Sequence, residues 1–255
     1  MKAHSEHQLL SEVDSPFRLL SPPFLLFTSL LAFSAHWLLS NYYAYIALGP
    51  GGLPHNIWGW LWSVAFKALS REGSSTSEYD GDPNGLSWLG DGERAALGNR
   101  EGSRPRKSWH VVPQRQLDQI PDDNMKRKLE TLLQECALKI PDLVELAISP
   151  HEKLHQVLVI HSSLPSPHTT ATTALREIAH VHVGSDWSLH TVLAPRDCKI
   201  VIERGWGERH PLEGALGLPR EYLMVYAARN QEELSGIVAI VRASVGYMTN
   251  SWAVL

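Results

Sequence analysis

The chain has 255 residues, of which 44% are hydrophobic and 20% are charged, and its formal net charge is −4. This composition is typical of one globular domain with an appendage, and the lack of a basic excess argues against a nucleic-acid-binding protein. There are only two cysteines, Cys136 and Cys198, which are far apart and lack metal-type spacing. They argue against a disulfide framework and favour a reducing compartment.

The N-terminal part predicts a polar tail followed by one membrane-spanning helix. Residues 1–18 are polar, and we expect them to form a mobile tail. From Leu19 through Phe66 there is no Asp, Glu, Lys or Arg, and the apolar run Pro23–Ala47 exceeds the roughly 20 residues that cross a bilayer. We therefore expect a transmembrane helix at residues 19–48. A cleaved signal peptide and a buried core helix are the alternatives, and the poorly basic leading region argues against the first.

The next residues predict a shorter helix and then a linker. The run Ile57–Leu69 is too short to span a bilayer, but helical spacing places Trp58 and Trp62 on one apolar face. We assign residues 49–70 to an interfacial amphipathic helix, with packing on the soluble domain as the alternative. Residues 71–102 are rich in Gly, Ser, Asp and Asn, which predicts a flexible linker.

Residues 103–255 are expected to form the main domain. The chain has no Asn-x-Ser/Thr sequon, which together with the cysteine usage favours a cytosolic domain, while the flanking charges leave the orientation open. The patterns predict helices at Asp122–Lys139, Pro195–Arg204 and Gln231–Tyr247, and strands at Leu143–Ile148, Leu154–His161, Glu177–Val183, Trp187–Leu193 and Glu221–Ala227. Because strands and helices do not alternate strictly, we expect an α+β fold with a largely antiparallel sheet flanked by helices.

The stretch Arg176–Leu212 gathers four of the thirteen histidines. His180 and His182 are two residues apart in a predicted strand, so they project from the same face. A turn then returns the chain as a second strand that carries His190, and the hairpin brings this histidine opposite the first pair. The helix that follows delivers further polar and aromatic residues, which are Trp206, Glu208, Arg209 and His210.

A set of short motifs occurs in a fixed order along the chain. They are GPGGLPHNIWGW, GNREGSRP and VVPQRQ upstream, REIAHVH, SLH and GWGERHPL in the histidine-rich stretch, and VYAARNQEE and ASVGYMTN beyond it. In this combination they resemble the fungal luciferases that oxidise 3-hydroxyhispidin, together with their non-luminous fungal relatives. The resemblance runs from about the predicted membrane segment to Asn250, and we expect a non-luminous relative.

The resemblance implies an oxygen-dependent reaction without a bound cofactor. In that reaction a pyrone with an acidic hydroxyl adds molecular oxygen, forms a strained peroxide and loses carbon dioxide. The chain has no glycine-rich nucleotide loop, so no flavin or nicotinamide site is visible. We therefore expect a membrane-anchored oxygenase that uses O2 as co-substrate, acts on a small aromatic or pyrone substrate and contacts membrane lipid. No protein partner is predicted.

The candidate site residues divide by the task they would perform. A histidine suits deprotonation of the hydroxyl, because its ordinary pKa lies near neutrality, and we predict His182 as the base, with His180 next. Asp186 or Glu177 would orient one of these rings. The remaining catalytic candidates are His190 and Arg209, which would stabilise the oxyanion, and His210. The substrate-binding candidates are Trp187, Trp206, Tyr226, Arg104 and Arg115.

Two other functions remain open from the residues alone. In the first, His180, His182 and His190 bind a divalent metal, because two imidazoles on one face and a third from a neighbouring strand fill three positions and leave one open. Glu177 or His210 would be an additional ligand. In the second, the protein is a non-catalytic relative that binds a small molecule. A polar network that only locks the hairpin to the helix is the purely structural alternative.

Overall fold

The computed structural model describes residues 22–82 and 85–254, and the chain divides into two compact units, Met1–Ala44 and Tyr45–Leu255. The predicted tail at residues 1–18 lies outside the described residues. Helix α1 (Pro22–Ile46) is predominantly apolar and carries no charged residue, and most of its side chains are exposed. Of the helices in the described ranges, it alone is long and apolar enough to cross a membrane, judged by length and composition.

The second unit is built on one six-stranded sheet with the order β1-β2-β3-β4-β6-β5. Every neighbouring pair of strands is antiparallel, which confirms the predicted α+β class with an antiparallel sheet. The strands are β1 (Val144–Ile148), β2 (Gln156–Ile160), β3 (Glu177–Val181), β4 (Leu189–Val192), β5 (Gly207–Arg209) and β6 (Tyr222–Val225). β5 was not predicted, because its three residues are too short to show an alternating pattern.

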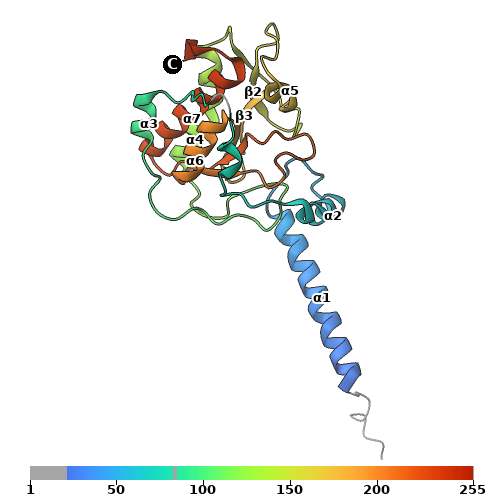
Figure 1. The fold of residues 1–255 in the computed structure, drawn as a ribbon. Helices are drawn as coiled ribbons and strands as arrows, with labels where there is room; N and C mark the ends of the chain where they lie inside the picture. The colour runs from blue at the N-terminus through green and yellow to red at the C-terminus, as the bar shows by residue number, and fades with distance from the viewer. Residues whose placement is uncertain (1–21, 83–84, 255) are drawn as a thin grey trace, which may run out of the picture. The chain divides into compact units, whose positions relative to one another are not determined.

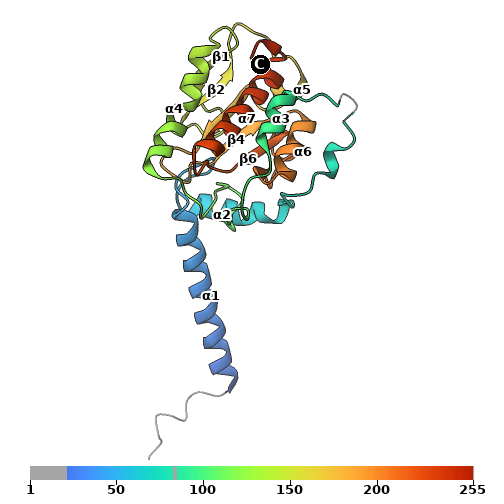
Figure 2. The same ribbon diagram turned by 90° about the vertical axis from the view of Figure 1, so that its left-hand side faces the viewer.

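Helices cover one face of this sheet (Figures 1 and 2). They are α4 (Asp123–Lys139) and α7 (Gln231–Thr249), with α6 (Pro195–Glu203) beside β5. Side chains cap the first turns of α4 and α7, since Asp122 accepts a hydrogen bond from the Met125 amide at 2.8 Å and Asn230 accepts one from the Glu233 amide at 2.9 Å. Gly205, at φ 79°, ends α6 in the left-handed conformation that favours glycine.

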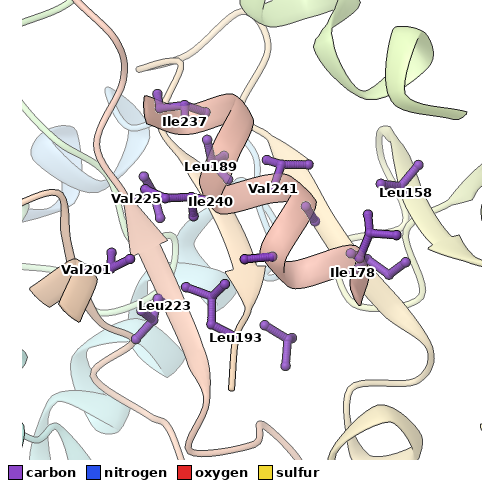
Figure 3. Close-up of a cluster of buried hydrophobic side chains, with 14 of the residues drawn as sticks. Leu158, Ile178, Leu189, Leu193, Val201, Leu223, Val225, Ile237, Ile240 and Val241 are labelled. Carbon is purple, nitrogen blue, oxygen red and sulfur yellow. The ribbon is translucent and has the colours of Figure 1, made fainter. Parts of the chain in front are cut away.

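The hydrophobic core lies between α7 and the sheet (Figure 3). Ile237 and Ile240 on α7 pack over strand residues such as Leu189 and Leu223, and all four side chains are fully buried. Burial of each stabilises the fold by about 1.5–3 kcal/mol before the cost of ordering is subtracted. This face of the sheet is therefore apolar, and any polar site on β3, β4 and β6 must lie on the opposite face.

Residues 71–102 are not a flexible linker, which corrects the prediction. The segment contains the short helices η3 (Ser77–Tyr79) and α3 (Asp91–Leu97), and four of its apolar side chains are buried in the core, namely Tyr79, Trp88, Leu89 and Leu97. These buried apolar residues are widely spaced in a Gly- and Ser-rich sequence, so they form no periodic pattern that would predict burial. The main unit accordingly begins at Tyr45 and not at residue 103.

The remaining helices are short. They are α2 (Ile57–Phe66), η2 (Lys67–Leu69), α5 (Thr169–Thr173) and η4 (Trp252–Val254). Asn56 caps α2 by accepting a hydrogen bond from the Trp58 amide at 2.9 Å. One side of α2 packs inward through Trp60 and Ser63, whereas Trp58 and Trp62 are 67% and 57% exposed. An apolar helix face is thus left on the surface of the domain.

Candidate active site

The polar face of the sheet carries the histidines. His180 of β3 is paired directly with His190 of β4, which is paired in turn with Met224 of β6. Residues that face each other across antiparallel strands point to the same side of a sheet, so both imidazoles lie away from the hydrophobic core. His182 follows His180 at the two-residue period and lies on the same side.

The three imidazoles converge in a buried cluster. The ring centroids of His180 and His182 are 5.1 Å apart, those of His180 and His190 are 5.1 Å apart, and those of His182 and His190 are 4.8 Å apart. One ring nitrogen of each lies within 4.8 Å of the other two. Exposure of the three residues is between 0% and 4%, so the cluster is shielded from bulk water.

The Nδ1 atoms of His180 and His190 both contact acceptors. His180 Nδ1 lies 2.5 Å from Oε1 of Glu177, and His190 Nδ1 lies 3.2 Å from the backbone carbonyl of Leu223. A carboxylate and a carbonyl can only accept, so each Nδ1 carries the hydrogen. In a neutral ring with this tautomer, the lone pair is left on Nε2.

His182 is held in a similar way. Its Nδ1 lies 2.9 Å from the Ser188 hydroxyl and 3.1 Å from Asp186, and the same hydroxyl donates to Asp186 at 2.7 Å. Because the hydroxyl proton is given to Asp186, the serine oxygen accepts from Nδ1. The Nε2 atoms of both His182 and His180 are buried and have no hydrogen-bond partner among the described residues. Such atoms are rare in folded proteins and call for an explanation.

A β-bulge brings Glu177 to the histidine face. β2 and β3 pair Leu158 with Ala179 but Val159 with Glu177, so β3 has one extra residue at Ile178. The extra residue reverses the alternation, and the Glu177 carboxylate turns toward His180 instead of the core. Its second oxygen accepts a hydrogen bond from Ser149 at 2.8 Å. The sequence pattern predicted the two residues but not the bulge that joins them.

Further polar and aromatic groups surround the trio. The ring of Tyr222 stacks on His190 with centroids 4.8 Å apart and an interplanar angle of 16°, and the His210 ring lies 5.4 Å from that of His190. Glu152 Oε1 is 3.8 Å from His180 Nε2. Glu152 Oε2 is buried and has no hydrogen-bond partner within the described ranges. The carboxylate of Glu152, with one unsatisfied oxygen, therefore lies beside the unsatisfied Nε2 of His180.

Arg115 fastens the loops that cover this face. Its guanidinium donates to the Pro50 carbonyl at 3.1 Å and to the Ser185 hydroxyl at 3.2 Å, and it lies 3.9 Å from Asp186. A Cβ at Gly51 would meet the Arg115 Nη2 atom at 2.4 Å, so only glycine allows this approach. The segment after α1 and the segment before α4 thus close over the histidines.

The charges of the site follow from burial. Burial, followed by the Arg115 charge, holds the pKa of His182 well below its usual range, and burial with the neighbouring histidines does the same for the pKa of His190. Burial lowers the pKa of His210 to about 3. For His180 burial is outweighed by the adjacent Glu177 carboxylate, which raises its pKa. Most of the cluster is consequently neutral imidazole.

A cavity of about 310 Å³ opens beside the loops that Arg115 holds together. Its lining includes Gly49, Arg115 and Asp186 together with the exposed apolar side chains of Leu117 and Ile120. Its volume lies at the lower end of the range for small-molecule sites, about 300–1,000 Å³. Asp186 adjoins both the cavity and His182, because it lines the cavity and its carboxylate lies 3.1 Å from His182 Nδ1.

Several predicted site residues lie outside the trio. Arg209 pairs with Glu78 at 3.2 Å and Glu213 at 3.4 Å, because the strand alternation that places Glu208 on the histidine face turns Arg209 away. Arg104 donates to the backbone carbonyls of Ile202 and Gly207.

The aromatic residues that were expected to bind the substrate also lie away from the trio. Trp206 packs against Gly236 of α7 in the core, and Trp187 is part of the same hydrophobic cluster. The Tyr226 hydroxyl contacts Glu208 at 3.3 Å, with its ring under Arg100. The aromatic side chain that does stack on the cluster is Tyr222.

Sequence reasoning missed four neighbours of the trio. They are Ser149, Glu152, Ser188 and Tyr222. Tyr222 and Ser188 had a usable signal, since Ser188 directly precedes the strand that carries His190 and Tyr222 lies two residues from Met224, the partner of His190 in the next strand. Ser149 and Glu152 belong to the turn between β1 and β2, where no periodicity predicts direction.

Comparison with known proteins places this site in a family. Residues 175–244 match the family model described as "Luciferase domain". The chain is 35% identical to a luciferase of Armillaria mellea over 235 residues, which is 87% of this chain and 85% of that protein. This chain belongs to the fungal luciferase family. A luciferase of Armillaria ostoyae is 35% identical over 82% of this chain and 81% of its own length, and one of Neonothopanus nambi is 33% identical over 82% and 80%.

No solved structure matches this luciferase-family chain significantly. The matched segment runs from two residues before β3 well into α7, so it contains the complete histidine trio, His210 and Tyr222. A luciferase-like function therefore follows at the level of the family, and the trio is the chemically richest part of the matched region.

Proposed function

We propose that the protein catalyses a luciferase-like, oxygen-consuming oxidation of a small aromatic or pyrone substrate that carries an acidic hydroxyl, with the histidine cluster as the reaction site. The observation that carries this assignment is the position of the trio. Three buried imidazoles converge inside the segment that matches the luciferase domain, and the Nε2 atoms of His180 and His182 have no hydrogen-bond partner among the described residues. Buried polar groups without partners are characteristic of sites built for a ligand.

The proposed reaction balances without an external electron donor. The hydroxyl loses its proton, the electron-rich ring adds O2 to form a cyclic peroxide, and cleavage of the O–O and C–C bonds releases carbon dioxide. The substrate itself supplies the electrons that reduce dioxygen. The protein must ionise the hydroxyl, hold the anion and exclude water from the peroxide.

The residues of the site suit these tasks. The cover fastened by Arg115 keeps water out, and the positive guanidinium favours an anionic ligand in the adjoining cavity. The hydroxyl can be ionised in two ways here. Either its proton passes to the Nε2 atom of His182, the base predicted from the sequence, or a cation held by the trio would supply the positive charge that favours the ionised hydroxyl. Both routes give the same reaction, and they differ in what the imidazole nitrogens hold.

We also propose that the protein is anchored in a membrane. We place α1 across a membrane as a single-pass anchor, with the main domain in the cytosol. Support comes from the exposed apolar surface of α1 and from the exposed Trp58 and Trp62 on α2, which suit the headgroup region. Tyr45, near the end of α1, donates a hydrogen bond to the Pro54 carbonyl at 2.8 Å, so α2 starts close to the end of the span.

Oxygen uptake tests the function. Full-length protein in detergent or nanodiscs is given a panel of hydroxylated pyrones and polyphenols, and dissolved O2 and released CO2 are measured together. The proposal predicts uptake with at least one pyrone and CO2 in a one-to-one ratio. The His161→Ala variant, which alters a half-exposed histidine on the protein surface, should behave like the wild type. Failure of every candidate with folded protein would exclude the luciferase-type reaction for this member.

A further inference from the structure

We propose that the Nε2 atoms of His180, His182 and His190 hold a divalent first-row metal ion, with Glu152 beside the open side of the site. The use of this ion in catalysis rests on the proposed function, whereas its binding does not. The candidate ligands come from two adjacent strands and face one another across them. A strand-borne site of this kind is rigid, because each backbone is held by the sheet.

The two nitrogens of each imidazole differ in their hydrogen bonding. In all three rings Nδ1 contacts an acceptor, which leaves the lone pair on Nε2. A buried imidazolium would donate from both nitrogens, yet Nε2 of His180 and of His182 has no acceptor at hydrogen-bond distance among the described residues. The lone pairs on these two buried Nε2 atoms have no proton donor among the described residues, and a metal ion bound by the trio would satisfy both at once.

The partners of the three Nδ1 atoms are of the kind found at metal-binding histidines. Metal-binding histidines almost always donate their other ring hydrogen to a carboxylate, a backbone carbonyl or water, which fixes the ring and raises its basicity. Here Glu177 serves His180, Asp186 with Ser188 serves His182, and the carbonyl of Leu223 serves His190. A polar network that only joined the hairpin to the helix would not require all three rings to be oriented in the same sense.

The net charge of the groups around the trio also favours a divalent cation. Three carboxyl groups adjoin the trio, on Glu152, Glu177 and Asp186, and one guanidinium does, on Arg115. With the carboxyl groups ionised and all three imidazoles neutral, which metal binding requires, three negative charges and one positive charge leave a net charge of −2. A divalent cation neutralises this balance in a buried site. Imidazole-rich sites favour zinc, iron, cobalt, nickel or copper over calcium and magnesium.

The geometry leaves room for the ion. Two nitrogens bound to one tetrahedral ion at about 2.1 Å lie about 3.4 Å apart, so rings now within 4.8 Å must approach by no more than about 1.4 Å. Small rotations of the side chains provide this movement. Glu152 Oε1 is 3.8 Å from His180 Nε2 and its other oxygen is unsatisfied, so the carboxylate adjoins the position left for a fourth ligand or a substrate oxygen.

The test measures binding separately from turnover. Full-length protein in detergent is stripped with a chelator and titrated with Co²⁺ while the visible d–d absorption is recorded, and with Zn²⁺ by calorimetry. We expect one equivalent of each ion, and bands of four- or five-coordinate cobalt. His190→Ala should remove the site. Asp186→Asn, which preserves size, should weaken binding by about 10- to 100-fold.

The control is His161→Ala, because His161 pairs with Glu145 at 3.8 Å in a half-exposed position and lies outside the trio. It should bind Co²⁺ and Zn²⁺ as the wild type does. The inference is overturned if wild-type protein binds no stoichiometric ion, or if Asp186→Asn has the wild-type affinity while keeping the wild-type melting temperature. Stoichiometric binding without oxygen uptake would leave the metal site standing and remove the proposed function. Full oxygen uptake by protein that cannot bind the ion would leave the proposed function standing and overturn the metal site.

Discussion

The bond between Glu177 and His180 permits a sharp prediction, made with the variant Glu177→Gln. The two oxygens of Glu177 accept from His180 at 2.5 Å and from the Ser149 hydroxyl at 2.8 Å, and the side chain is 1% exposed. Glutamine has the same shape but presents an NH2 group to one of these partners. If that group faces His180, the ring must move its hydrogen to Nε2, where no acceptor lies within the described structure.

If the NH2 group faces Ser149 instead, it meets a hydroxyl oxygen that already accepts from the backbone amides of His151 and Glu152. Either orientation leaves one buried polar group unsatisfied, which costs about 1–3 kcal/mol of unfolding free energy. The first orientation also removes a lone pair from the trio. We therefore expect a lower melting temperature and an affinity for Co²⁺ reduced by about 10- to 100-fold.

Thermal unfolding of the full-length protein and the cobalt titration measure these two effects. The matched control is Glu145→Gln, which makes the same change at a carboxylate that accepts from the Ser162 amide at 2.8 Å and lies beside His161. Because this carboxylate is 37% exposed, we expect a change within about 0.5 kcal/mol. If Glu177→Gln matched Glu145→Gln in both measurements, the reasoning about the bulge and the tautomer would be refuted.

Three further outcomes are expected. Gly207→Ala should lower the unfolding free energy by about 1–3 kcal/mol in thermal melts, because its Cβ would lie 2.4 Å from the Met224 carbonyl oxygen; an unchanged melt would contradict the tight β5–β6 contact. In nanodiscs containing brominated lipid, replacing Trp58 and Trp62 with tyrosine should reduce the quenched tryptophan fluorescence to the part that comes from Trp37 of α1, and unchanged quenching would rule out an interfacial α2. In sealed vesicles with the cytosolic surface outside, an impermeant thiol reagent should label Leu138→Cys, which is 73% exposed at that position; labelling only after detergent would reverse the orientation.

Much of the fold follows from local pattern. The helix expected at Asp122–Lys139, the hairpin that carries the histidines and the pairing of His180 with His190 were all predicted, because each depends on residues close in the chain. The two-residue period of a strand is strict, and it fixes which side chains share a face whatever the rest of the protein does.

The parts that could not be predicted depend on distant contacts. Composition labelled residues 71–102 as a linker, yet Trp88 and Leu89 bury their side chains against segments more than 100 residues away, where Asp197 accepts a hydrogen bond from the Trp88 amide at 2.7 Å. Likewise Arg209 was expected at the trio on proximity in sequence, but one position of strand alternation turned it toward Glu78. Glu152 joins the site from a turn, whose direction no periodic pattern encodes.

The most direct test of the account is oxygen uptake by His182→Ala, measured beside substrate binding and thermal melting in the same full-length preparation. The account predicts that the variant retains its fold and most of its ligand binding but consumes oxygen about 100-fold more slowly or not at all. Uptake equal to that of His161→Ala, in protein that binds substrate normally, would show that the buried histidines are not where the reaction takes place.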